Sequence, residues 1–113
     1  MDFNLLRQGA EDAERLLKSL SNSNRLLILC QLIDGEKAVN ELEDAIGIRQ
    51  PTLSQQLARL RKDRMVDARR DGKTIFYRLA SEESRAVIEL LYGLYCSPNG
   101  PALARRLEYA TVR

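Results

Sequence analysis

Histidine is absent from this chain of 113 residues. Its absence excludes Ser–His and Cys–His catalytic pairs and removes the commonest protein ligand of metal ions. The chain also lacks a Cys-x-x-Cys motif, a phosphate-binding glycine loop and a carboxylate pair suited to hydrolysis. We therefore predict that the protein is not an enzyme and that it uses neither a metal ion nor another cofactor.

Long apolar runs are absent as well. No stretch approaches the length of a membrane-spanning helix and no basic-then-apolar leader opens the chain, so we expect a cytoplasmic protein without membrane contact. With 44% hydrophobic and 30% charged residues, the chain should fold as one small domain, and dimerisation would supplement its modest core. We place this domain at residues 1–96. Residues 97–113 are expected to form a tail that is either partly helical or disordered.

Apolar side chains recur at helical spacing in the first half of the chain, which predicts helices over residues 10–20, 25–34, 37–48 and 51–63. The second of these is expected to bury Leu26, Leu29, Cys30 and Ile33. Gly47 suits the left-handed residue that ends the third helix, and Pro51 suits the first turn of the fourth. Two short helices joined by such a turn form a helix-turn-helix. Ser81 is the expected N-cap of a last long helix that runs to about Cys96.

The period of the pattern changes to two between residues 65 and 80. Apolar and polar residues alternate before Asp71-Gly72 and again after it. Asp-Gly between alternating runs predicts a β-hairpin with a type I′ turn, whose two central residues both need positive φ. A helix-turn-helix followed directly by a basic hairpin is a winged helix. We therefore predict a mainly α fold with a small β-hairpin, a winged helix-turn-helix.

Basic charge is concentrated in one third of the chain. Residues 49–78 hold nine basic and three acidic side chains, whereas residues 1–48 hold five basic and nine acidic ones. Such a distribution is typical of a protein that binds a polyanion, although a solvated basic face is also possible.

The predicted helix over residues 51–63 has one apolar and one polar face. Leu53, Leu57 and Leu60 lie within about 60° of one another at ~100° per residue. The major groove of DNA admits a helix, and amides, hydroxyls and guanidinium groups read its base edges. The candidate base-reading residues are Gln50, Thr52, Ser54, Gln55, Gln56 and Arg59. The candidate phosphate contacts, which position a protein without reading sequence, are Lys62, Arg69, Arg70 and Lys73.

The chain resembles the ArsR/SmtB family of bacterial winged-helix repressors in three stretches, LSNSNRLLILCQLIDGE, VNELEDAIGIRQPTLSQQLARLRKDRMV and RRDGKTIFYRL. The resemblance implies a homodimer paired through its first and last long helices. It also implies that the dimer binds inverted-repeat operator DNA and releases it when an inducer binds. Many members bind metal through a Cys-x-Cys segment on the third helix or through Asp, His and Glu on the last. This chain has KAVNELED at the first place and no histidine, which argues against an arsenic or zinc sensor.

Cys30 and Cys96 are the two cysteines of the chain. From the pattern alone they are either free core thiols or redox-active ones, because a static disulfide is unusual in a reducing cytosol. Their places in LLILCQL and LYGLYC resemble the BigR/SqrR branch of the family, whose members sense persulfides and other reactive sulfur species through two thiols. HlyU-type regulators have the same pair. The resemblance therefore implies that Cys30 and Cys96 are redox-sensing residues and that the inducer is a reactive sulfur species.

Geometry suggests the form of the cross-link. Packed helix axes are usually ~8–10 Å apart, and a direct disulfide needs Cα atoms about 4.4–6.8 Å apart. We therefore hypothesise that one thiol becomes a persulfide and the other closes a polysulfide bridge. The resemblance implies that this change releases DNA at sulfide detoxification genes.

Three alternatives remain open. The same DNA-binding scaffold could respond to peroxide or to an electrophile. The winged helix could bind another protein instead of DNA, with the amphipathic helix as an ordinary surface helix. A thiol oxidoreductase is disfavoured, because the two thiols are 66 positions apart and lie on predicted helices.

Overall fold

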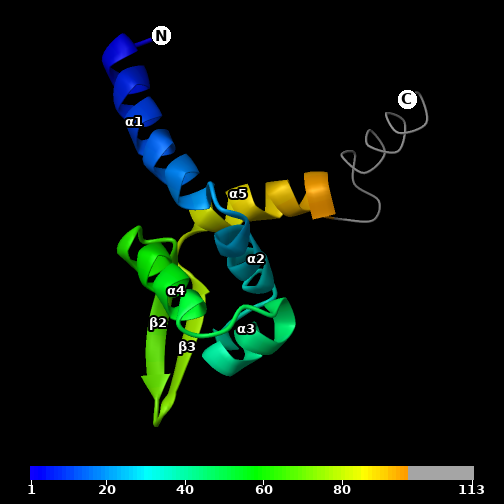
Figure 1. The fold of residues 1–113 in the computed structure, drawn as a ribbon. Coiled ribbons are helices and arrows are strands. Elements are labelled where there is room, and N and C mark those ends of the chain that lie inside the picture. Colours follow the sequence, from blue (N-terminus) through cyan, green and yellow to red (C-terminus); the bar gives the residue numbers. More distant parts are fainter. Residues whose placement is uncertain (97–113) are drawn as a thin grey trace, which may run out of the picture.

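The computed structural model describes residues 1–96, which form a mainly helical winged helix-turn-helix with a small antiparallel sheet (Figure 1). The helices are α1 (Phe3–Leu20), α2 (Ser23–Gln31), α3 (Val39–Ile46), α4 (Thr52–Lys62) and α5 (Glu82–Leu91), and a π-helical turn, η1 (Tyr92–Cys96), continues α5. The strands are β1 (Lys37–Ala38), β2 (Val66–Asp71) and β3 (Thr74–Leu79). The predicted fold class is confirmed. The tail expected at residues 97–113 lies outside the described residues.

Side-chain caps explain where several helices begin and end. Asn22 accepts a hydrogen bond from the backbone N–H of Arg25 at 3.1 Å, and Ser81 accepts one from the N–H of Ser84 at 3.1 Å. Each oxygen satisfies an N–H group that has no partner within its helix. Gly47 has φ +72 and ends α3 in the left-handed conformation, as predicted.

The core lies where α2, α3, α4, α5 and the inner ends of the strands meet. Its largest fully buried side chains include Leu29, Leu42, Leu53, Leu57, Leu60 and Ile88. The stripe expected for α2 was only partly right: Leu29 is buried, but Leu26, Cys30 and Ile33 are half-buried, and Ile28 and Leu32 are fully buried instead. The reason is that α2 packs against α1, α3, α4 and α5, so burial is not confined to one stripe.

The wing is the β2–β3 hairpin, and β1 pairs with the free side of β3 to complete a sheet of order β1-β3-β2. Asp71 pairs with Thr74, so the two-residue turn is Gly72-Lys73. Positive φ occurs at Gly72 but not at Lys73, so the predicted type I′ turn is wrong. Strand β1 was not predicted, because two residues are too short to show a period.

The helix boundaries differ most from the predictions at the start of α1 and at the end of α5, and those of α2, α3 and α4 differ by one to three residues. Helix α1 begins at Phe3 rather than at residue 10, because the Asp2 carboxylate caps it by accepting hydrogen bonds from the backbone N–H groups of Asn4 and Leu5. Its first part buries no side chain, so the sequence holds no core stripe there. The regular part of α5 ends at Leu91, and the wider π-helical turn carries the chain on to Cys96.

Helix α1 projects from the rest of the structure, at the end opposite the wing (Figure 1). Its buried residues are Ser19 and Leu20, in its last turn. Among residues 1–96, no helix combines the length and apolar character that crossing a bilayer requires.

Candidate nucleic-acid interface

Helix α4 presents the polar face that the sequence predicted. Leu53, Leu57 and Leu60 are buried beneath it, while Thr52 and Gln55 are exposed on its outer side. Because the N-terminal half of such a helix is the part that enters the major groove, this exposed side is the candidate reading face.

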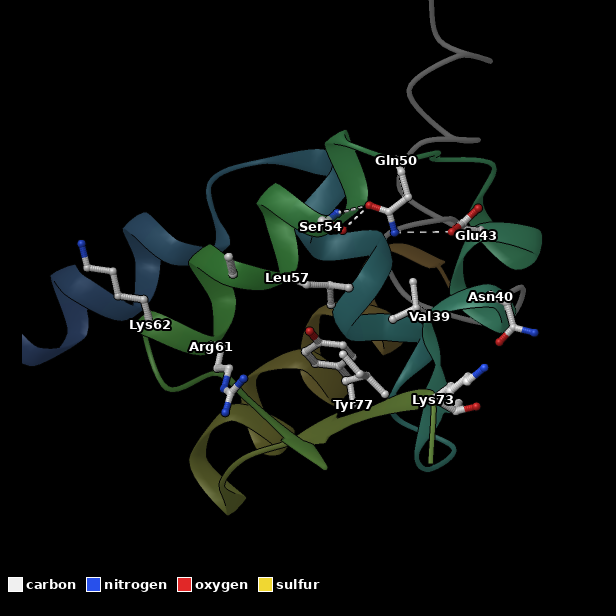
Figure 2. A pocket seen from close by; sticks show the side chains of 13 residues that line it. Val39, Asn40, Glu43, Gln50, Ser54, Leu57, Arg61, Lys62, Lys73 and Tyr77 are labelled. Atoms are coloured by element: carbon white, nitrogen blue, oxygen red, sulfur yellow. Dashed lines mark hydrogen bonds between the residues drawn. The ribbon is translucent and has the colours of Figure 1, made fainter. Parts of the chain in front are cut away.

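Gln50 and Ser54 hold the start of α4 in place. The Gln50 side-chain oxygen accepts hydrogen bonds from the Ser54 backbone N–H at 3.2 Å and from the Ser54 hydroxyl (Figure 2). The Gln50 amide nitrogen donates to Glu43 at 3.4 Å. These contacts tie α4 to α3, so both residues are already engaged in the helix-turn-helix.

Gln56 and Arg59 also have partners within the protein. Gln56 is half-buried and accepts a hydrogen bond from the Arg25 guanidinium at 3.1 Å. Arg59 pairs with Asp63 at 2.7 Å. Burial alone would raise the pKa of the Asp63 carboxyl, but the hydrogen bond from Arg59 and the charges of Arg59 and Arg25 lower it. Of the six candidate base-reading residues, Thr52 and Gln55 are the two whose side chains have no partner among residues 1–96.

An open groove of about 790 Å³ separates α4 from the wing, with α3 at one end. Figure 2 shows Leu57 and Tyr77 between Arg61 on one side and Lys73 on the other. Lys62 lines the same groove. Arg61 was missed as a candidate because it lies beside the leucine stripe in the helical pattern, and only the position of the wing places it on the groove.

The two neighbouring arginines of the wing lie on opposite faces of the sheet, because side chains alternate along a strand. Arg69 pairs across the hairpin with Phe76, and Arg70 pairs with Ile75. Ile75 lines the groove, so Arg70 shares the face that looks toward α4. Arg70 is exposed, and its side chain has no hydrogen-bond or ion-pair partner among residues 1–96.

Arg69, in contrast, is held on the far face of the wing. Its guanidinium donates two hydrogen bonds to Glu36, at 2.6 and 2.8 Å, and lies 4.5 Å from the centre of the Phe76 ring. The hydrogen bond from Arg69 and its charge lower the pKa of the Glu36 carboxyl. This bidentate pair connects the wing to the loop before β1. It also neutralises the positive charge of Arg69, which the sequence predicted to contact a DNA phosphate.

The structure brings the two cysteines together, although they are 66 positions apart. Both are free thiols; Cys30 is half-buried on α2 and Cys96 is exposed at the end of η1. Burial raises the pKa of the Cys30 thiol, and the charge of Cys96 and a hydrogen bond with it raise that pKa further. The Cys96 thiol therefore lies near enough to Cys30 to influence its protonation.

Comparison with known proteins identifies the family. Residues 22–68 match the family model described as bacterial regulatory protein, arsR family. The biofilm growth-associated repressor of Agrobacterium fabrum strain C58 is 47% identical over 93 residues, which span 82% of this chain and 80% of that protein. This chain belongs to the ArsR family.

Other members of the ArsR family agree in sequence and in structure. The transcriptional activator HlyU of Vibrio cholerae is 43% identical over 88% of this chain and 92% of its own length. The crystal structure of the transcriptional repressor BigR from Xylella fastidiosa has a TM-score of 0.78 at 43% identity and covers 86% of this chain and 99% of its own. A homodimeric winged helix-turn-helix DNA-binding domain from Mycobacterium bovis has a TM-score of 0.67 at 36% identity over 75% of this chain and 81% of its own.

Membership of the ArsR family confirms that this protein is a DNA-binding transcriptional regulator and not an enzyme. Within the part of this ArsR-family chain that the structure describes, no group of three or more His, Cys, Asp or Glu side chains is placed to hold a metal ion.

Proposed function

We propose that the protein is a homodimeric transcriptional repressor that binds an inverted-repeat operator and releases it when Cys30 and Cys96 become linked. The observation that supports regulation by the thiols is that Cys96, at the end of η1, lies near enough to Cys30 on α2 to raise its pKa. Repression is supported by similarity to proteins named as repressors, BigR among them.

The assignment of DNA contacts follows from which side chains are free. Gln55 and Thr52 read base edges, since they are exposed on α4 and have no partner among the described residues. The groove-facing basic side chains, which bind phosphates, are Arg61, Lys62, Arg70 and Lys73. The residues that hold α4 in position are Gln50, Ser54, Gln56 and Arg59, and Arg69 holds the wing.

Dimerisation through α1 and α5 is supported by the apolar side chains that both helices expose. On α1, Phe3 is 63% and Leu5 69% exposed, and on α5 Leu90 is 61% exposed. Pairing these helices with those of a second copy would bury this surface, and burial of apolar area stabilises association. The homodimeric Mycobacterium bovis relative supports a homodimer.

The inducer that we propose is a hydropersulfide, R–S–S–H. The exposed Cys96 thiolate attacks its outer sulfur and releases R–SH, and the resulting persulfide takes a second sulfur from another R–S–S–H in the same way. Cys30 then attacks the middle sulfur of Cys96–S–S–SH and expels H₂S. In total, two thiols and two hydropersulfides give one trisulfide bridge, two R–SH and one H₂S. The bridge pulls on the end of α5, a dimer element, and so changes the separation of the two α4 helices.

Peroxide is a second candidate inducer, because the Cys96 thiol lies near enough to Cys30 to raise its pKa, and H₂O₂ can oxidise two nearby thiols directly to a disulfide. Two thiols and one H₂O₂ would give a disulfide and two H₂O.

Operator release distinguishes the two inducers. The DNA is selected by the reduced protein from a random duplex library, and binding is measured after treatment with a hydropersulfide, with H₂O₂ or with iodoacetamide. Release by hydropersulfide, with a trisulfide joining the Cys30 and Cys96 peptides in the mass spectrum, supports the proposal. A plain disulfide as the product, or release by H₂O₂ alone, favours the second candidate.

Two variants show whether the thiols are regulatory. Cys30→Ser and Cys96→Ser proteins should bind the selected DNA like the reduced wild type but should ignore the inducer. A folded variant that no longer binds DNA would make that cysteine structural.

A further inference from the structure

Helix α1 is attached to the rest of the described chain at one end. Ser19 and Leu20 are its buried residues, and Leu16 is half-buried against the core, whereas the first part of the helix lies free of the body (Figure 1). Whatever holds the last turn of α1 therefore decides the direction in which the whole helix points.

Arg25 holds this last turn. Its Nε donates to the backbone oxygen of Ser19 at 2.6 Å, and its Nη2 donates to the backbone oxygen of Lys18 at 3.2 Å. The last four carbonyl groups of a helix have no partner within the helix. The bond from Nε satisfies the Ser19 oxygen, and the Lys18 oxygen, which already accepts the Ser21 backbone N–H at 3.3 Å, gains a second donor. The planar guanidinium makes both bonds in a fixed direction, which a lysine could not reproduce.

The Arg25 guanidinium also contacts helix α4. Nη1 of Arg25 donates to Oε1 of Gln56 at 3.1 Å, in a partly buried position. Arg25 itself is fixed at the start of α2, where its backbone N–H is bonded to Asn22. One side chain from α2 therefore joins the end of α1 to the middle of α4, and we refer to Arg25, Gln56 and the two α1 carbonyls as the Arg25 junction.

We propose that Arg25 and Gln56 are positioning residues that set the angle between α1 and α4 and thereby the spacing of the two half-sites that the dimer prefers. The inference rests on the proposed function, because it requires α1 to pair in a homodimer that binds DNA. It removes Gln56 from the base-reading residues and gives it a different effect on specificity: Gln56 selects the distance between half-sites rather than a base.

Helix α1 is long enough that a small change in its angle at the Arg25 junction displaces its far end by several ångströms. The 18 residues of α1 span about 27 Å at 1.5 Å per residue. A tilt of ~10° at one end would move the other end by about 5 Å. One base pair advances the duplex by ~3.4 Å, so this displacement is comparable with a change of one base pair in spacing.

The test uses the full-length protein with Arg25→Lys and Gln56→Met. Binding is measured on a set of duplexes that carry the selected inverted repeat with its half-sites one base pair closer, unchanged, or one base pair further apart, and on a duplex with one half-site. Both variants should bind the unchanged repeat about tenfold more weakly than wild type, with little change on the single half-site. Their preference for the unchanged spacing over the altered ones should fall by a similar factor.

Two further variants serve as controls. Arg15→Lys changes an exposed arginine of α1 that pairs with Asp12, and it should retain the wild-type spacing preference. Gln56→Glu keeps an acceptor for Arg25, so it should also retain that preference even though its added charge weakens binding to every duplex. Circular dichroism and the dimer fraction are measured for each variant, and Gln56→Met decides the matter if Arg25→Lys does not fold.

If the variants lose affinity equally for the single half-site and for the repeat, the proposed role of the junction is overturned. Arg25 would then only stabilise the DNA-binding surface of each subunit. An unchanged spacing preference in Gln56→Met would overturn it as well. A wild-type protein that is monomeric, or that selects no DNA, contradicts the proposed function itself, and this outcome is recognised before any variant is measured.

Discussion

Arg69 and Arg70 are neighbours in the sequence, but β2 directs them to opposite faces of the wing, and we expect them to contribute differently to DNA binding. Arg70 is exposed on the groove side, whereas Arg69 is bonded to Glu36. Replacing Arg70 with Gln removes one proposed phosphate contact per subunit. Replacing Glu36 and Arg69 together with Gln removes an ion pair and leaves the net charge unchanged.

The expected effects follow from counterion release. Each phosphate contact contributes about 0.9 to the slope of log K against log salt concentration. A dimer of Arg70→Gln has lost two contacts, so the magnitude of its slope should fall by about 1.8. Its loss of affinity relative to wild type should then be about twelvefold larger at ~50 mM salt than at ~200 mM. For the Glu36→Gln/Arg69→Gln double variant the slope should stay within about 0.5 of the wild-type value.

Fluorescence anisotropy of a labelled duplex, titrated at several salt concentrations, measures both slopes. The temperature of unfolding of each protein is recorded so that a loss of fold is not mistaken for a loss of charge. If the double variant loses as much slope as Arg70→Gln, then Arg69 contacts phosphate despite its bond to Glu36, and the assignment of faces is wrong. If Arg70→Gln leaves the slope unchanged, the wing does not approach the DNA backbone through this residue.

Three other predictions concern stability and thiol reactivity. Leu57→Ala should lower the free energy of unfolding by about 2–5 kcal/mol in urea titrations, because Leu57 is buried beneath α4; a loss below ~1 kcal/mol would contradict this packing. Ser81→Ala should cost about 1 kcal/mol in the same assay, because the Ser84 N–H loses its capping acceptor, while an unchanged midpoint would show that water replaces the cap without loss. Iodoacetamide should label Cys96 before Cys30 near neutral pH, since Cys30 is half-buried and its raised pKa leaves a smaller thiolate fraction. Labelling of Cys30 should accelerate as the pH rises; peptide mass spectrometry follows both rates, and faster labelling of Cys30 at neutral pH would contradict the expected order.

Local patterns predicted most of the helices and the hairpin. The leucine spacing of α4, the left-handed Gly47 and the Ser81 cap each depend on a few adjacent residues, and all three are present in the structure. Predictions failed where local sequence carries little information. The start of α1 has no buried stripe, and β1 is formed by its partner β3 rather than by its own two residues.

The sequence by itself determined that this chain forms a winged helix with an amphipathic recognition helix, a basic wing and no histidine-dependent chemistry. Tertiary structure alone decided which polar side chains remain available to DNA. Arg25 and Gln56 are 31 residues apart, Glu36 and Arg69 are 33 apart, and Cys30 and Cys96 are 66 apart. A hydrogen bond or ion pair between such distant residues has no local periodicity to reveal it, because it depends on how the helices and the wing pack together.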